Sequence, residues 1–197
     1  MRWSALGKVD AVSIHDYPHP ALTADVVLFA VGEGALRVLL IQRNKPPFEG
    51  AWAFPGGFVN VGEAPRDAAL RELKEETSLQ NLVLEQLHTF GEPGRDPRGH
   101  VVTVTYLGVV HADAPRRTEA GSDAAQARWW PVDELPLLAF DHADVLAYAL
   151  RRLRSELTGI VDPSDLLPGS MTLGELRAAR EIAGRIVRTT DWVKKEA

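Results

Sequence analysis

The hydrophobic and polar positions of this chain follow two periods, which together predict a β-rich domain with two helices. Runs of apolar and β-branched residues, typical of buried strands, occupy 23–31, 36–42, 82–90, 101–110 and 126–132. Residues 51–59 predict a short strand that ends in a Pro-Gly-Gly loop. Apolar residues at helical spacing cover 65–77 and 141–157. We therefore expect a mixed α/β domain in which helices pack on a sheet, with a hairpin joining the first two strands.

The composition changes after residue 158. Residues 159–171 contain several Pro, Gly, Ser and Asp residues, which indicates a linker. An amphipathic helix follows, and Thr172 with Glu175 forms the capping box that predicts its start. We therefore predict a main domain over 1–158, and a linker with a C-terminal helical extension over 159–197.

Composition and charge narrow the functional classes. The net charge of −5 argues against non-specific nucleic-acid binding as the main activity, and it suits a protein whose acidic groups hold metal ions. No apolar run is long enough to span a bilayer, and the first twenty residues lack the apolar stretch of a secretory signal. The chain has no cysteine, which agrees with a reducing compartment. We expect a cytoplasmic protein with no membrane partner.

Three glutamates share one face of the first predicted helix. Glu72, Glu75 and Glu76 are spaced by three and four residues, so their side chains point the same way. On an exposed helix this is a solvated acidic face, because like charges at this spacing cost only about 0.2–0.5 kcal/mol per pair. In a partly enclosed site, charges about 5 Å apart repel by roughly 3 kcal/mol, and the cluster then requires cations. Mg²⁺ suits such a cluster, since it takes carboxylate oxygens and bridges to substrate phosphates.

Two glycines precede this helix and strengthen the metal interpretation. Gly56 and Gly57 allow the backbone to approach a ligand closely and to turn a carbonyl toward a metal. Each feature alone is weak evidence. The glycines and the three carboxylates together predict a metal site.

The segment 57–79 resembles the Nudix box, G-x5-E-x7-R-E-U-x-E-E-x-G-U, in which U is aliphatic. The matching positions are Gly57, Glu63, Arg71, Glu72, Leu73, Glu75, Glu76 and Leu79. One position departs, because Ser78 stands where the family has glycine. A left-handed backbone there costs a residue with a side chain about 1–2 kcal/mol, so we expect a local difference in this loop.

The resemblance implies a Nudix fold, with a mixed sheet between helices, and a role for each matching residue. It implies that Glu72, Glu75, Glu76 and the Gly56 carbonyl ligate Mg²⁺ or Mn²⁺, and that Glu63 and Arg71 orient the loop and the carboxylates. The implied reaction is attack of a water on one phosphorus of a diphosphate, with Glu75 and Glu76 as catalytic residues. The general base stays open between Glu76 and two acids on a distant loop, Glu119 and Asp123.

Segments outside the box resemble the ADP-ribose pyrophosphatase branch of the family and the related regulators of NAD metabolism. These segments are HPALTADVVLF, RNKPPFEGAWAFPGGFV, PGRDPRG and ARWWPVDELP. They imply a small nucleotide substrate, ADP-ribose, and the products AMP and ribose 5-phosphate. The candidate donors to phosphate or ribose oxygens are Arg43, Arg95 and Arg98, and the candidate rings for adenine are Phe54, Tyr106 and Trp129.

Relatives in this branch commonly form homodimers, so a homodimer is expected here, with Trp3 and Trp52 as candidate interface residues. Some relatives are transcriptional regulators in which a Nudix domain senses ADP-ribose and a C-terminal winged helix binds DNA. The stretch LLPGSMTLGEL resembles the start of that module, but residues 159–197 are too few for a complete winged helix. DNA is therefore not the expected partner. The other alternative is hydrolysis of nucleoside triphosphates or of another sugar nucleotide.

Overall fold

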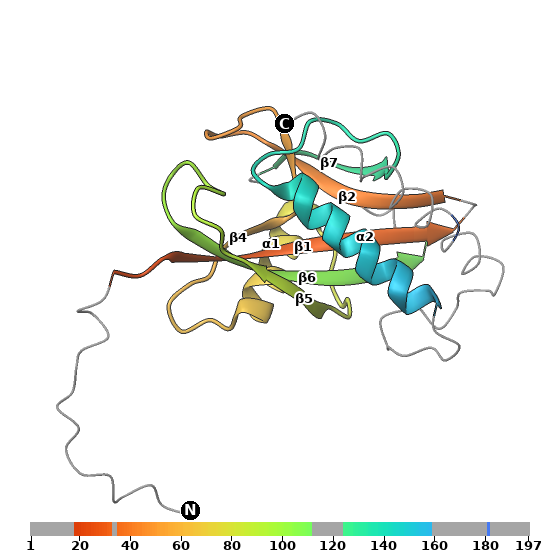
Figure 1. The fold of residues 1–197 in the computed structure, drawn as a ribbon, viewed down its shortest axis with the longest axis horizontal. Helices are drawn as coiled ribbons and strands as arrows, with labels where there is room; N and C mark the ends of the chain where they lie inside the picture. The colour runs from red at the N-terminus through yellow and green to blue at the C-terminus, as the bar shows by residue number, and fades with distance from the viewer. Residues whose placement is uncertain (1–17, 33–34, 112–123, 159–180, 182–197) are drawn as a thin grey trace, which may run out of the picture.

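The computed structural model describes residues 18–32, 35–111, 124–158 and 181 (Figure 1). Its elements are, in order, β1 (Ala21–Gly32), β2 (Ala35–Arg43), β3 (Trp52–Ala53), β4 (Gly56–Phe58), α1 (Pro65–Thr77), β5 (Glu85–Phe90), β6 (Val101–His111), β7 (Ala124–Pro131) and α2 (His142–Thr158). The predicted mixed α/β fold is confirmed.

The described strands form one seven-stranded sheet in the order β3-β2-β1-β6-β5, with β4 paired to β1 and β7 paired to β2. The predicted hairpin is present, because β1 and β2 are antiparallel neighbours. In contrast, β1 and β6 are parallel over their whole length, from Ala21↔Val101 to Val31↔His111. The short strand β4 runs antiparallel to the first half of β1, with Asp25 opposite Gly56. This pairing fixes the Pro-Gly-Gly loop against the centre of the sheet.

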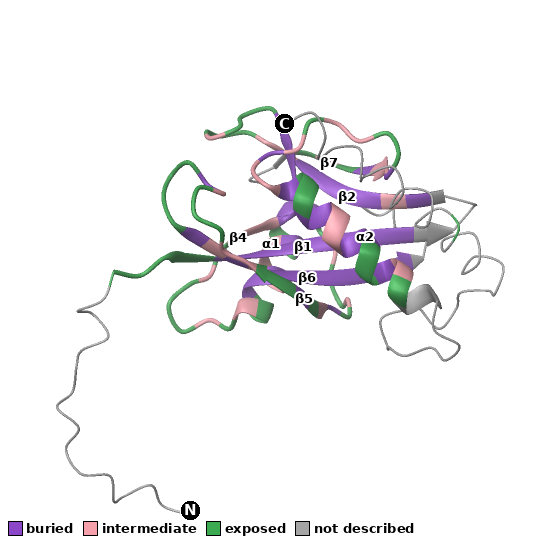
Figure 2. Cartoon of the chain, viewed as in Figure 1, coloured by how far each residue is buried: buried purple, intermediate pink, exposed green. Residues whose placement is uncertain are grey.

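The two helices cover opposite faces of the sheet, as the alternation of side chains along a strand requires. In β1, Val27 and Phe29 belong to the same core cluster as Leu150 and Leu153 of α2. The intervening residues of β1 pack with α1 on the other face, in a cluster of Ala24, Val26, Leu28, Ala68, Ala69 and Leu73. Figure 1 shows α2 lying across the sheet and α1 behind it, and Figure 2 shows the buried strands between them. The sheet therefore lies between helices, as expected.

Element bounds follow the predictions closely, with one instructive exception. The helix α1 has the predicted bounds, and Pro65 occupies its first turn, where a missing N–H costs nothing. The strand expected from residue 82 begins only at Glu85. Leu82 and Leu84 instead pack against the α1 cluster from the loop before the strand. Their apolar pattern reports burial in the core and not sheet pairing.

Ser78 does not produce the expected local difference. It adopts the left-handed conformation, with φ 61° and ψ 5°, and its N–H donates to the Lys74 carbonyl at 2.9 Å. This is the C-terminal cap that glycine makes most easily. The chain therefore keeps the backbone expected of the family motif despite the side chain, and the prediction of a different loop is wrong.

The two tryptophans expected at a dimer interface have different outcomes. Trp52 is only 9% exposed and packs edge-on against Trp130 at 5.1 Å, so it is a core residue and not an interface residue. Trp3, residues 159–180 and residues 182–197 lie outside the described residues, so the domain boundary and the helical extension stay predictions. Within the described residues, no helix is long and apolar enough to cross a membrane.

Candidate active site

A cavity of about 430 Å³ lies where β1, β2, β4, α1 and the start of α2 meet. The four predicted substrate-contacting residues, Arg43, Phe54, Arg95 and Arg98, all line it. Its lining also includes Gly56 and the motif residues Gly57, Arg71, Glu72 and Glu76. The lining runs from Thr23 to His142, so the structure brings together in one hollow residues that lie more than half of the chain apart.

The packing of α1 gives its three carboxylates different environments. Leu73 and Thr77 are buried toward the sheet, and this orientation turns Glu72 and Glu76 toward the cavity. Glu76 is 7% exposed. Glu75 lies on the outer side, and its side chain is 53% exposed. The expectation of one shared face therefore holds for Glu72 and Glu76 more closely than for Glu75.

The two glycines of β4 are required by the close approach of acidic side chains. The Gly56 N–H donates to Glu76 Oε2 at 2.9 Å, which fixes this carboxylate beside β4. A Cβ atom on Gly57 would overlap the Glu72 carboxylate, and one on Gly56 would overlap Asp25 and the Ala24 carbonyl. Only glycine permits both contacts at once.

Arg71 holds two of the motif's glutamates in fixed orientations. Its Nε and Nη2 donate to Glu63 at 2.8 and 2.9 Å, a bidentate geometry, and its Nη1 donates to Glu72 Oε1 at 2.6 Å. Hydrogen bonds from Arg71 lower the pKa of Glu63 to about 2. Hydrogen bonds to Glu63 and Glu72 raise the pKa of Arg71. This is the geometry that an orienting role for Glu63 and Arg71 requires, and the role itself stays a prediction.

The oxygen donors at the cavity suit a hard divalent cation. Glu72 and Glu76 bring carboxylates to a wall where Gly56 and Gly57 of β4 carry no side chain, and Mg²⁺ favours carboxylate and carbonyl oxygens with water. Within the described residues, no three Asp, Glu or His side chains converge as a ready-made metal cluster. Glu72 instead pairs with Arg71. The metal ligands Gly56, Glu72, Glu75 and Glu76 therefore stay predictions.

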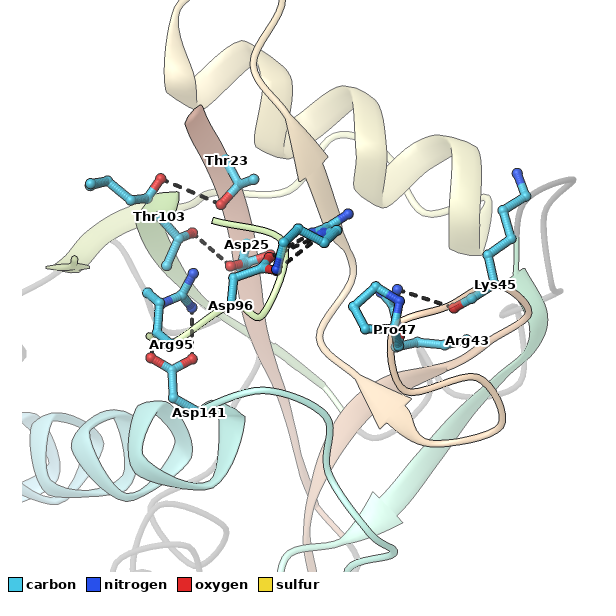
Figure 3. Close-up of polar contacts among 11 residues, drawn as sticks. Thr23, Asp25, Arg43, Lys45, Pro47, Arg95, Asp96, Thr103 and Asp141 are labelled. Atoms are coloured by element: carbon cyan, nitrogen blue, oxygen red, sulfur yellow. Dashed lines mark hydrogen bonds and ion pairs between the residues drawn. The ribbon is translucent and has the colours of Figure 1, made fainter. Parts of the chain in front are cut away.

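Arg95 and Arg98 are each anchored by hydrogen bonds from their Nε and Nη2 atoms. Arg95 donates from Nε and Nη2 to the two oxygens of Asp141, at 2.9 and 2.7 Å (Figure 3). Arg98 donates from Nε and Nη2 to Asp96, at 3.0 and 2.7 Å. Burial would raise the pKa of Asp96, but hydrogen bonds from Arg98 outweigh it and the pKa lies below its ordinary value. In both arginines, Nη1 has no hydrogen-bond partner among the described residues.

Arg43 repeats this arrangement with backbone acceptors. Its Nε donates to the Pro47 carbonyl at 2.8 Å and its Nη2 to the Lys45 carbonyl at 3.3 Å (Figure 3). The described residues again offer no partner to its Nη1. Burial and the positive charge of Arg98 both lower the pKa of Arg43. A cation that is destabilised by burial and by a second cation beside the same cavity favours the binding of an anion there.

An aromatic residue in a strained conformation contacts both of these cations. The Arg43 and Arg98 guanidinium carbons lie 4.8 and 5.7 Å from the centre of the Phe140 ring, within the range of cation–π contacts. Phe140 has φ 53°, a left-handed conformation that costs a residue with a side chain roughly 1–2 kcal/mol. Such strain persists only where surrounding contacts enforce it, and it is frequent at binding sites.

The predicted aromatic contacts to adenine are only partly available. Tyr106 and Trp129 belong to the core cluster on the α1 side and do not line the cavity, so these two candidates are wrong. Phe54 does line the cavity. One face of its ring stacks on His142, with centroids 4.8 Å apart and planes 20° apart.

Several polar residues that line the cavity or hold its arginines were missed by sequence reasoning. Asp25 is 9% exposed in the middle of β1 and accepts a hydrogen bond from Thr103 Oγ1 at 2.6 Å (Figure 3). A lone aspartate within the apolar run TADVVLFAV is a signal that was available. His142, Asp96 and Asp141 carry no comparable signal, because nothing in their local sequence distinguishes them. Glu119 and Asp123, the loop candidates for the general base, lie outside the described residues.

Comparison with known families identifies the family of this chain. The sequence model of the NUDIX domain matches residues 19–165, which include the cavity and the whole of the acidic motif. The chain belongs to the Nudix hydrolase family. The resemblance found in the sequence is therefore confirmed, as are the fold and the general class of enzyme. Nudix hydrolases generally use divalent metal ions.

Individual Nudix relatives include both enzymes and regulators. An ADP-ribose pyrophosphatase of Methanocaldococcus jannaschii is 40% identical over 136 residues, which cover 68% of this chain and 76% of the relative. An ADPR-responsive transcriptional repressor, NtrR, of Acinetobacter baylyi is 38% identical over 172 residues, which cover 85% of this chain and 68% of the relative.

Solved Nudix structures resemble the whole fold. A MutT/nudix family protein from Enterococcus faecalis has a TM-score of 0.72 and 33% identity, and the match covers 88% of this chain and 81% of that one. The NUDIX domain of Shewanella oneidensis NrtR in complex with ADP ribose has a TM-score of 0.64 and 33% identity, over 74% of this chain and 96% of that one.

Proposed function

We propose that this Nudix hydrolase cleaves ADP-ribose to AMP and ribose 5-phosphate in a reaction that depends on Mg²⁺ or Mn²⁺. One observation carries the proposal: a single cavity combines the motif carboxylates Glu72 and Glu76 with the anchored arginines Arg43 and Arg98. A diphosphate needs both, because its charge must be neutralised while one phosphorus is attacked. The identity of 40% to an ADP-ribose pyrophosphatase supports the choice of substrate.

The chain's own residues bind and orient the substrate. A bound divalent ion would supply charge neutralisation and a more acidic water. The free Nη1 edges of Arg43 and Arg98 donate to phosphate oxygens, and the other edges keep the guanidinium planes fixed. Arg71 and the Gly56 N–H hold the carboxylates of Glu72 and Glu76 in place before substrate arrives. The general base is proposed among Glu76, Glu119 and Asp123.

Substitution of the motif carboxylates tests the proposal. Glu76→Gln is expected to lower kcat for ADP-ribose by about 10²-fold or more while the protein stays folded, because the amide keeps the shape of the side chain and loses its charge. The same loss is expected for Glu75→Gln. Glu134→Gln is the matched control, since Glu134 is exposed and does not line the cavity. AMP release is measured by chromatography and folding by circular dichroism. Retention of most activity by both motif variants contradicts the proposal.

A substrate panel separates ADP-ribose from the other substrates of this reaction class. We expect kcat/KM for ADP-ribose to exceed that for nucleoside triphosphates and for other sugar nucleotides, at fixed Mg²⁺ and with phosphate detection after phosphatase treatment. A nucleoside triphosphate or another sugar nucleotide at the head of this ranking overturns the choice of substrate. The assignment to a Nudix hydrolase would stand.

A second candidate function is regulation of transcription in response to ADP-ribose. The observation that favours it is the similarity to the repressor of Acinetobacter baylyi, which extends over 85% of this chain. The structure of NrtR from Shewanella oneidensis also matches, with 34% identity over 86% of this chain and a TM-score of 0.71. Binding of the full chain to the DNA upstream of its own gene, with and without ADP-ribose, tests this function. Sub-micromolar, sequence-dependent binding would place regulation ahead of hydrolysis.

A further inference from the structure

Two buried polar residues line the cavity without a part in the chemistry proposed above. Asp25 on β1 is the register partner of Gly56, and His142 at the start of α2 accepts a hydrogen bond from the Phe54 N–H. Both are therefore attached to the same three-residue segment, 54–56. Both also line the cavity, and the charge of Asp25 acts on the His142 ring, so the two groups lie near each other there.

His142 is fixed as a neutral hydrogen-bond donor. Its Nδ1 accepts from the Phe54 N–H at 3.0 Å, so the ring hydrogen is on Nε2. Burial lowers the pKa of His142, which keeps the ring neutral near pH 7. The ring stacks on Phe54 and lies 5.5 Å from the Phe140 ring, which together fix its plane. No described residue accepts a hydrogen bond from Nε2, although His142 is only 3% exposed.

Asp25 supplies an acceptor on the same wall. Its Oδ2 accepts from Thr103 Oγ1 at 2.6 Å, and this bond fixes the carboxylate plane. Its Oδ1 lies beside Gly56, at a point where any larger residue would overlap it. Among the described residues, Oδ1 has no hydrogen-bond donor. Both residues line the cavity, so a ligand that fills it excludes water from this acceptor and this donor. A ligand that pairs with both groups removes the cost of leaving them unpaired.

We propose that Asp25 and His142 recognise a ribose hydroxyl of the substrate. A hydroxyl both donates and accepts, so it donates to Asp25 Oδ1 and accepts from His142 Nε2–H. This assignment rests on the proposed function and adds a determinant of specificity to it. A substrate without that hydroxyl leaves two buried polar groups unpaired and is rejected for this reason.

Two analogues of ADP-ribose test the proposal, one lacking the 2′-hydroxyl of the adenosine ribose and one lacking the 2′-hydroxyl of the terminal ribose. We expect the wild-type kcat/KM to fall by roughly 10- to 100-fold for one of them, the range for a hydrogen bond to a charged partner. In Asp25→Asn and His142→Asn this discrimination shrinks to less than about threefold, because activity falls with ADP-ribose and not with the deoxy analogue. His142→Asn keeps an acceptor for the Phe54 N–H.

Thr105→Val is the matched control. Thr105 is the register partner of Asp25 on β6 and is buried, but it does not line the cavity. Its Oγ1 has no hydrogen-bond partner among the described residues, so valine fits the site. We expect this variant to keep the full wild-type discrimination. Loss of discrimination here would show that any change in this part of the sheet is sufficient, and would overturn the proposal.

The outcomes separate this proposal from the proposed function. If the wild-type enzyme has the same kcat/KM for ADP-ribose and both deoxy analogues, the hydroxyl site is overturned. It is also overturned if Asp25→Asn and His142→Asn both lower kcat/KM by the same factor for all three compounds. If the wild type cleaves none of them, the proposed function fails. Calorimetry then measures Kd for the three compounds with the wild type and the same variants. Weaker binding of one deoxy analogue to the wild type, with a smaller difference in the variants, supports the hydroxyl site, and equal Kd values for all three compounds overturn it. Either variant that folds is sufficient for the comparison.

Discussion

Replacement of Arg95 by methionine is expected to destabilise the protein by about 3 kcal/mol. The side chain of Arg95 is 4% exposed and that of Asp141 is 21% exposed, so the variant leaves a largely buried carboxylate without its partner. Removal of one member of a buried ion pair costs roughly 3–5 kcal/mol. The lower end applies here, because water reaches part of Asp141.

The pair also joins two elements that carry the site. Arg95 lies in the loop between β5 and β6, and Asp141 directly precedes α2, which begins with His142. Urea unfolding followed by circular dichroism at pH 7 measures the loss in the single variants Arg95→Met and Asp141→Asn and in the double variant. We expect the double variant to be more stable than the sum of the single losses predicts, by about 1 kcal/mol or more.

The same variants decide what Arg95 does. If Arg95 mainly positions the loop, stability falls and kcat/KM falls with it through both kcat and KM. A loss of stability below about 1 kcal/mol, together with a raised KM and an unchanged kcat, would refute this reasoning. Arg95 would then be a residue that contacts substrate, as the sequence predicts.

Two further predictions concern stability. Ser78→Gly is expected to stabilise the fold by about 1 kcal/mol, because glycine adopts φ 61° without steric cost. Ser78→Ala is expected to bring no gain. Urea unfolding measures both variants, and equal midpoints would contradict the explanation. The free energy of unfolding is also expected to fall as the pH drops below 6.5, the ordinary pKa of histidine, by up to about 1.4 kcal/mol per pH unit. Burial lowers the pKa of His142, so below pH 6.5 the unfolded chain binds a proton at this residue and the folded chain does not. The charged groups that act on this ring are Asp25, Arg43, Arg95 and Asp141. In His142→Asn the slope between pH 5 and 6.5 should be smaller than in the wild type, and an unchanged slope would assign the pH dependence to other groups.

Sequence patterns predicted the elements that depend on local spacing. The bounds of α1 follow from Pro65, the apolar period and the acidic motif, all of which lie within one segment. The hairpin of β1 and β2 follows for the same reason. The start of β5 was misplaced because burial, and not strand pairing, explains Leu82 and Leu84.

Contacts between distant segments account for what the sequence did not show. Asp25 and Thr103 are 78 positions apart, and they meet only because β1 and β6 are parallel in one particular register. Arg95 and Asp141 are 46 positions apart, so nothing in the sequence indicated that they form an ion pair. Arg95 was therefore interpreted as an arginine available to phosphate. The exposed fraction of the side chain also differs among the glutamates of α1, since Glu75 is more exposed than Glu72. Helical spacing alone does not predict this difference.

The three arginines of the cavity have a consequence for how tightly and how selectively it binds. Arg43, Arg95 and Arg98 lose side-chain freedom when the chain folds, since each is held by two of its nitrogen atoms. Ligand association therefore needs little additional ordering, which favours affinity. Lysine has a single nitrogen and cannot be held at one edge while it donates from another. An arginine-to-lysine exchange at these positions preserves the charge and removes the rigidity.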